Sequence, residues 1–213
     1  MSYPINYPTP QGANVQILYK TDDWVKPQGA SFVWFTLIGA GGTYGVSGGG
    51  SGAVTNFMCP AFLIPDVLRV NIGIGGTQAT PTGTATTLVY QEKDGTGYTL
   101  LTASFGRSDG IAGAAMTANY FTAMGFFQSV AGQAGSTTSI SASNTTFLSG
   151  GGTGGYTVTA NYGYSTNQNG MFQLQPIIVG LGAASSTSGF AGIGCGGSQN
   201  GNGGDGLAVI ITW

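Results

Sequence analysis

Hydrophobic and polar residues alternate in three stretches of the chain, at positions 14–20, 68–74 and 207–213. Apolar side chains at every second position are typical of a β-strand with one buried face. In the first stretch the apolar positions are Val15, Ile17 and Tyr19. We expect the last stretch to pair with strands of the first half, which closes one domain.

Two further segments predict strands of other kinds. Phe32–Ile38 reads FVWFTLI and is apolar almost throughout, as in a central strand covered on both faces. Residues 86–105 contain two strand-like runs around Asp94 and Gly95, a dipeptide that tolerates the backbone angles of a tight turn. We therefore expect a hairpin there.

The middle of the chain, residues 110–206, is dominated by glycine, serine, threonine and asparagine. Residues 156–164 alternate and predict one strand with an aromatic face. Residues 114–127 fit either a short helix or a buried strand, because small residues and methionine give no decisive period. The pattern leaves both alternatives open.

Composition favours a folded protein without catalysis. Glycine occupies 40 of 213 positions, yet 41% of residues are hydrophobic and the net charge is only -2, so the chain can bury a core. It has no histidine, and no charged residue occurs between Gly110 and Gly204. Acid–base, nucleophilic and metal-assisted catalysis all need such groups. We expect no enzyme activity and no catalytic, cofactor-binding or metal-binding residues.

The domain organisation follows from the same patterns. We expect an extended N-terminal arm at 1–13, rich in proline, that docks on another protein. One β-sandwich domain, jelly-roll-like, should occupy 14–213. Its uncharged, glycine-rich elaboration spans about 110–204 and has long loops rich in Gly, Ser, Thr and Asn.

The acidic and aromatic residues have structural interpretations. Asp22 and Asp23 are adjacent, so on a strand their side chains point to opposite faces. Glu92 and Asp94 flank the expected hairpin turn. Neither pair is expected to form a catalytic site. We interpret three aromatic residues as core or interface positions, namely Trp24, Tyr162 and Tyr164. The alternative is that they stack on sugars.

Cys59 and Cys195 lie far apart and lack the spacing of a metal site, so we interpret them as small buried hydrophobes, with a disulfide as the alternative. The glycine motifs at 150–155 and 192–197 fit G-x-G-x-x-G, but dinucleotide binding requires a helix after the motif. Here the predicted strand 156–164 follows the first motif and SQNGNGG follows the second. The five basic residues are scattered, which argues against nucleic acid. The sequence contains no long apolar run, so we do not expect membrane insertion.

Four segments together resemble a known family. They are YKTDDWVKPQGASFVWFTLIGAGG at 19–42, SGGGSGA at 47–53, VLRVNIGIGG at 67–76 and GNGGDGLAVIITW at 201–213. Their order is similar to the glycine-rich domain of tail, fibre and other virion proteins of bacteriophages and large viruses. The glycine run at 39–42 is shorter than usual in that family, so packed polyglycine helices, which some phage adhesins use, are not expected.

The resemblance implies a non-enzymatic structural protein of a virion. We expect it to self-associate as a capsid, vertex or spike subunit, with other copies of itself and other virion proteins as partners. One alternative is a tail-fibre adhesin for host attachment, with a host-surface receptor or glycan as partner. The other is a virus-borne polysaccharide depolymerase, which would need two carboxylates about 5–10 Å apart in one cleft.

Overall fold

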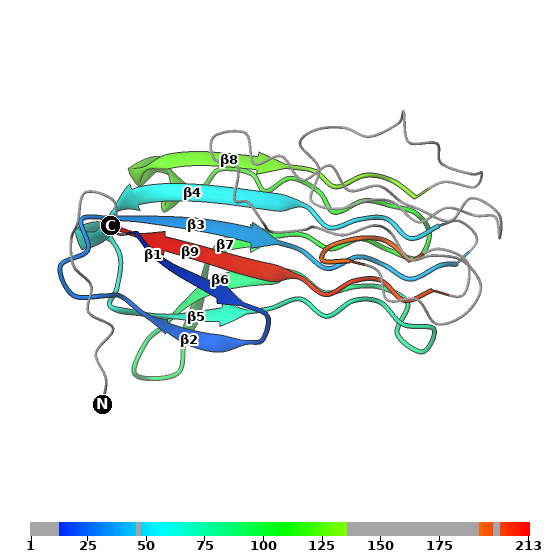
Figure 1. The fold of residues 1–213 in the computed structure, drawn as a ribbon, viewed down its shortest axis with the longest axis horizontal. Helices are drawn as coiled ribbons and strands as arrows, with labels where there is room; N and C mark the ends of the chain where they lie inside the picture. The colour runs from blue at the N-terminus through cyan, green and yellow to red at the C-terminus, as the bar shows by residue number, and fades with distance from the viewer. Residues whose placement is uncertain (1–12, 46–47, 136–191, 198–200) are drawn as a thin grey trace.

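The computed structural model describes residues 13–45, 48–135, 192–197 and 201–213 (Figure 1). Within these ranges the chain forms strands and two short 3₁₀ turns. The strands are β1 (Asn14–Leu18), β2 (Asp22–Val25), β3 (Phe32–Ile38), β4 (Val54–Pro60), β5 (Val67–Asn71), β6 (Thr86–Gln91), β7 (Gly97–Ala103), β8 (Phe126–Val130) and β9 (Leu207–Thr212), and the turns are η1 (Ala61–Leu63) and η2 (Thr122–Met124).

The strands form two antiparallel sheets that pack face to face. One sheet has the order β1-β9-β3-β4-β8 and the other has the order β2-β5-β6-β7. The predicted all-β sandwich is therefore confirmed. The fold shares its two packed sheets with a jelly roll. Its strand connections differ from those of a jelly roll, because β5, β6 and β7 follow one another as a meander within one sheet.

The core lies between the two sheets and is centred on β3. Phe35 of β3 is opposite Phe57 of β4, and both side chains are fully buried. Trp24 of β2 meets the edge of Phe35, with ring centroids 5.5 Å apart. Six of the seven residues of β3 are buried, which confirms that Phe32–Ile38 is a central strand. Trp24 is a core residue, as interpreted from the sequence.

Other predicted elements can also be compared with the structure. β9 pairs with both β1 and β3, so the last strand does return to the sheet of the first half. β6 and β7 form the expected hairpin, with Gly95 at a φ of 90° in its turn. The ambiguous stretch 114–127 contains η2 and the start of β8. The predicted strand at 156–164 and the arm at 1–13, apart from Ala13, lie outside the described residues.

The orientation of β1 differs from the expected one. Gln16 pairs with the fully buried Ile210 and shares its inward-facing side of the sheet. Val15 and Ile17 are on the outward side, and their exposed fractions are 51% and 40%. Tyr19, just beyond the strand, is 62% exposed. The expectation that these apolar residues form the buried face is wrong, because alternation distinguishes the two faces of a strand without saying which one faces the core.

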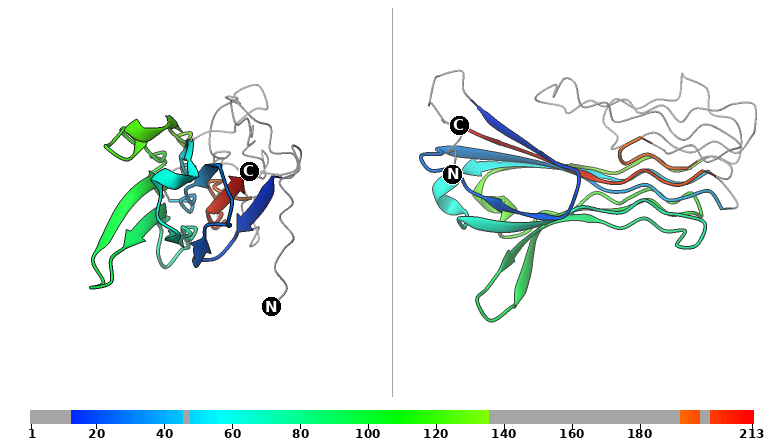
Figure 2. Two further views of the ribbon diagram at one scale, coloured as in Figure 1. Left: turned by 90° about the vertical axis from the view of Figure 1, so that its left-hand side faces the viewer. Right: turned by 60° about the horizontal axis from the view of Figure 1, so that its bottom comes forward.

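The sandwich occupies only one end of the described structure. Beyond it the chain continues as extended segments that run side by side, toward the right in Figure 1 and in the right-hand view of Figure 2. We call this part the glycine bundle and define it by residues 39–45, 48–53, 72–76, 81–85, 104–113, 131–135, 192–197 and 201–206. No helix in the described ranges is long and apolar enough to cross a membrane.

Candidate functional site: the glycine bundle and its end loops

The segment 39–44 lies at the centre of the glycine bundle and donates its N–H groups with a period of three residues. Each successive donor points to a different neighbouring segment, and the direction repeats after three positions. Gly39 and Gly42 donate to 48–53, Ala40 and Thr43 donate to 81–84, and Gly41 and Tyr44 donate to 201–206, with N···O distances of 2.9 and 3.0 Å, 3.3 and 3.0 Å, and 2.9 and 3.4 Å.

The carbonyl groups of the same segment bind three other neighbours. Those of Ala40, Gly41 and Gly42 accept hydrogen bonds from the N–H groups of Gly106, Gly76 and Gly197, at 2.8, 2.9 and 2.8 Å. These three donors lie in segments other than the three that accept from 39–44. The central segment is therefore hydrogen-bonded to six neighbours.

A second segment, 48–53, shows the same period. Gly49 and Gly52 donate to 192–197, whereas Gly50 and Ala53 donate to 104–107. Three residues per turn without internal hydrogen bonds are the signature of the polyproline II type of helix. Every N–H of such a helix must find a partner outside it. The expectation that packed polyglycine helices are absent is therefore wrong, since these segments pack in that manner.

Close approach of main chains explains why glycine is needed here. A Cβ atom built on Gly41 would overlap the carbonyl group of Cys195, and one on Gly106 would overlap that of Gly50. Neither glycine has a positive φ, so space and not backbone conformation excludes larger residues. The high glycine content thus has a geometric cause in the bundle.

Small polar side chains complete the hydrogen bonding where the bundle meets the sandwich. Thr86 Oγ1 accepts from Gly73 N at 3.0 Å and donates to Ile38 O at 2.6 Å. Asp205 Oδ1 accepts from Gly75 N at 2.7 Å. These side chains replace main-chain partners at the points where a strand ends and an extended segment begins.

The end of the bundle farthest from Trp213 carries compact loops (Figure 1). In loop 77–80, Thr77 N donates to Thr80 O at 2.8 Å, and the hydroxyl groups of the two threonines are 2.9 Å apart. In the loop at 107–111, Arg107 forms an ion pair with Asp109 at 2.7 Å, and both side chains are partly exposed. We call 77–80 and 107–111 the end loops. Each is held in shape by its own hydrogen bonds.

A shallow groove of about 330 Å³ runs along the side of the bundle. Its walls include Tyr19, Ile74 and Ile193, and main chain from 203–206 contributes to its lining. The carboxylate of Asp205 also lines it but is bonded to Gly75 N. The groove can accommodate an apolar or polar neutral group, and it brings no second carboxylate close to Asp205.

No family model matches this chain, and no curated protein is significantly similar to it.

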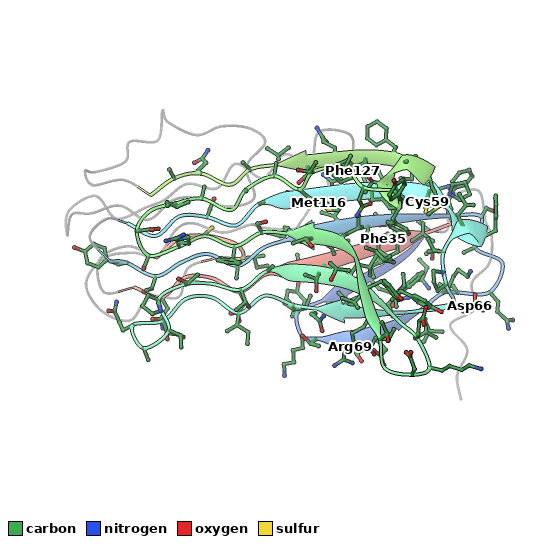
Figure 3. All side chains as sticks on the ribbon, turned by 180° about the vertical axis from the view of Figure 1, so that it is seen from behind. Phe35, Cys59, Asp66, Arg69, Met116 and Phe127 are labelled. Atoms are coloured by element: carbon green, nitrogen blue, oxygen red, sulfur yellow. The ribbon has the colours of Figure 1, made fainter. Side chains whose placement is uncertain are left out.

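Two of the acidic residues considered in the sequence, Asp23 and Asp94, have structural partners in the sandwich. Asp23 forms an ion pair with Arg69 at 2.9 Å, across the pair of strands β2 and β5 (Figure 3 labels Arg69). Asp94 Oδ1 accepts from Thr96 N at 2.8 Å in the hairpin turn, and this hydrogen bond lowers the pKa of Asp94. Within the described ranges no three His, Cys, Asp or Glu side chains gather as a metal site would require.

The two cysteines are buried in separate hydrophobic clusters and are not joined by a disulfide. Cys59 packs in the main core, where burial raises the pKa of its thiol from 9.0 to about 11. Cys195 lies in the motif 192–197, which is a segment of the glycine bundle. The interpretation as small buried hydrophobes is confirmed. The other motif, 150–155, and the aromatic residues Tyr162 and Tyr164 lie outside the described residues.

Proposed function

We propose that this chain is a non-enzymatic structural protein of a virus particle that uses the glycine bundle to hold host-recognition loops away from the sandwich. The observation that carries this proposal is the bundle itself, a main-chain scaffold with six-neighbour hydrogen bonding around 39–44. The resemblance to glycine-rich virion domains supplies the virion context.

The geometry favours attachment over a simple shell role. The end loops lie at one end of the described structure, whereas Trp213 and the start of β1 lie at the other (Figure 1). Side-chain changes in the end loops leave the main-chain hydrogen bonds of the scaffold intact, including those that the carbonyl groups of Arg107 and Gly110 accept from Gly50 and Gly135. A rigid support also reduces the entropy that the loops lose when they bind. Among the functions expected from the sequence, the host-attachment adhesin therefore has the strongest support.

A binding experiment on whole cells tests this proposal. The fluorescently labelled protein is incubated with a panel of bacterial strains, and strains that bind it are used to compare variants. Ala79→Arg and Ile111→Arg add a large cation at two exposed positions near the loop end, so binding should be lost in both. Gln91→Arg, an exposed position near the β6–β7 turn of the sandwich, is the matched control and should bind normally.

The outcome that would contradict the proposal is equally concrete. If Ala79→Arg and Ile111→Arg bind cells as well as the unaltered protein does, the end loops do not recognise the host. Loss of binding in Gln91→Arg alone would move recognition to the sandwich. Cleavage of a surface glycan that disappears on substitution of Asp22, Glu92 or Asp94 would instead support the depolymerase alternative.

The second candidate is a self-associating shell, vertex or spike subunit. A specific observation favours it, because the outer face of the five-stranded sheet exposes apolar side chains of β1 and of the chain end near β9. The two candidates are compatible, since the end loops and this face lie on different parts of the protein.

A further inference from the structure

The outer face of the five-stranded sheet has an apolar strip at the end of the sandwich away from the bundle. We define it by Val15, Ile17, Phe32, Ile211 and Trp213. Val15 and Ile211 are directly opposite each other on β1 and β9. The rings of Phe32 and Trp213 stack with centroids 6.0 Å apart at 20°, and their exposed fractions are 40% and 43%. The strip therefore contains aromatic and β-branched side chains but no charge.

The same face is covered by the chain itself farther along the strands. There Ile193 and Cys195 pack on Ile38, Val54 and Leu207. The chain thus buries the apolar residues of this face next to the bundle and half-buries Ile211 against them. It leaves the other four members of the apolar strip exposed. An exposed apolar patch of a few hundred Å² is often a functional surface, and stacked aromatic rings supply large contact area to a partner.

The strand at the edge of this face lacks the features that usually prevent association. β1 has the sequence NVQIL, with no charge, proline or glycine, and its register with β9 is uninterrupted. The edge strand β2 of the other sheet differs, because it carries the exposed residues Asp22 and Asp23. At the opposite edge of the five-stranded sheet, Met116 N donates to Ser129 Oγ, so the segment before η2 is bonded to β8.

We propose that the apolar strip is the interface with a second copy of this chain, which applies the same face to form a two-fold dimer. In a two-fold dimer the same patch of both subunits forms the interface, so a patch with net charge would face an identical charge and repel it. The uncharged apolar strip has no such repulsion. The exposed area of the strip is on the order of 400 Å², about half of the 800 Å² that each partner contributes to a standard interface. A fraction of that size is typical for the apolar part of an interface, with a polar rim supplying the remainder.

The three tryptophans of the chain make this face directly observable. Trp24 and Trp34 are 1% and 5% exposed, whereas Trp213 is 43% exposed. Quenching of tryptophan fluorescence by acrylamide therefore reports mainly on Trp213. In the dimer Trp213 is covered, and dilution to the monomer should raise the quenching. The variant Trp213→Phe should lose this dependence on concentration.

Light scattering over a dilution series measures the mass in parallel. We expect a dimer at high concentration, and we expect Ile17→Lys to raise its dissociation constant at least about thirtyfold, as for a central interface residue. Ile74→Lys is the matched control, because Ile74 is 67% exposed on the bundle and outside the strip. Circular dichroism checks that both variants fold, which their exposure allows.

Three results would each overturn the proposal. They are a monomer at every concentration, a dimer that Ile17→Lys leaves unchanged, and a dimer whose dissociation does not alter the quenching of Trp213. A monomer in which Trp213 is already shielded would show that another part of the chain covers the strip. The proposal does not rest on host recognition by the end loops, since Ala79→Arg should remain dimeric even where it abolishes cell binding.

Discussion

The substitution Gly41→Ala tests whether glycine is needed at this position for space, because Gly41 does not have a positive φ. Gly41→Ala places a Cβ against the main chain of Cys195, and both partners are fixed by neighbouring segments. We expect a loss of about 2–3 kcal/mol in the free energy of unfolding, as for an overpacked core. Urea denaturation followed by circular dichroism measures the change.

Gly97→Ala is the control for this substitution. A Cβ on Gly97 would be 3.4 Å from Val89 Cγ1, which is an ordinary contact, and its φ is not positive. We expect an unchanged or slightly higher free energy of unfolding, because alanine reduces the freedom of the unfolded chain. Equal losses in Gly41→Ala and Gly97→Ala would contradict the close packing of the bundle.

Cys59 should be unreactive in the folded protein. Burial raises the pKa of its thiol from 9.0 to about 11, so near pH 8 the thiolate fraction is roughly a hundredfold lower than in the unfolded chain. In a Cys195→Ala background, alkylation by iodoacetamide, followed by mass spectrometry, should be at least that much slower in buffer than in urea. Similar rates in the two solutions would show that Cys59 is accessible.

The free energy of unfolding should fall at high pH because burial raises the pKa of the Cys59 thiol. The raised pKa of Cys59 contributes stability that is fully present below pH 9 and is lost as the pH rises toward 11. Cys59→Ala removes this contribution. The decline in the free energy of unfolding between these pH values should therefore be shallower in the variant.

The extended segments of the bundle should exchange their amide hydrogens slowly, although they are neither helices nor strands. The N–H groups of 39–44 and 49–53 are hydrogen-bonded, and most of these residues are buried. We expect protection comparable to that of β3, and much faster exchange in the exposed turn at 92–96. Hydrogen exchange followed by mass spectrometry makes the comparison. Exchange in 39–44 as fast as in 92–96 would contradict the hydrogen-bonded bundle.

The sequence predicted the strands well where side chains carry the pattern. Phe32–Ile38 and the final strand were recognised because apolar side chains record burial at each position. The strand β4 (Val54–Pro60) has a mixed pattern, since Thr55 and Asn56 are buried with hydrogen-bonded side chains, and it was missed. The face of β1 was assigned wrongly for the reason given above.

The bundle and the end loops were harder to predict because main-chain groups make their contacts. A signal was nevertheless present, since glycines three residues apart occur next to strands, as in Gly39 and Gly42 after β3 and Gly203 and Gly206 before β9. This spacing matches a helix with three residues per turn. The clustering of the end loops follows only once the segments are packed together, so no local pattern could reveal it.

For the protein as a unit, the small number of charges predicts stability that is insensitive to salt. Within the described ranges the ion pairs are Lys26–Asp66, Arg69–Asp23 and Arg107–Asp109, and each has at least one well-exposed partner. Such pairs contribute about 0–1 kcal/mol each. We expect the free energy of unfolding to change by less than about 1 kcal/mol between low and high sodium chloride, measured by urea denaturation with the protein held at one concentration. A larger change would show that charges stabilise the fold more than these contacts indicate.

The dense main-chain packing around Gly41 also bears on how a gene for this protein can change. Every amino-acid substitution of a glycine introduces a side chain, and at the crowded positions none fits without a shift of the main chain. Mutations should therefore be purged from the scaffold and accumulate at exposed positions such as Gln78 and Ala79. The residues that build the support would stay constant while those of the loops diversify, so the surface proposed to recognise a partner can change without any change of fold.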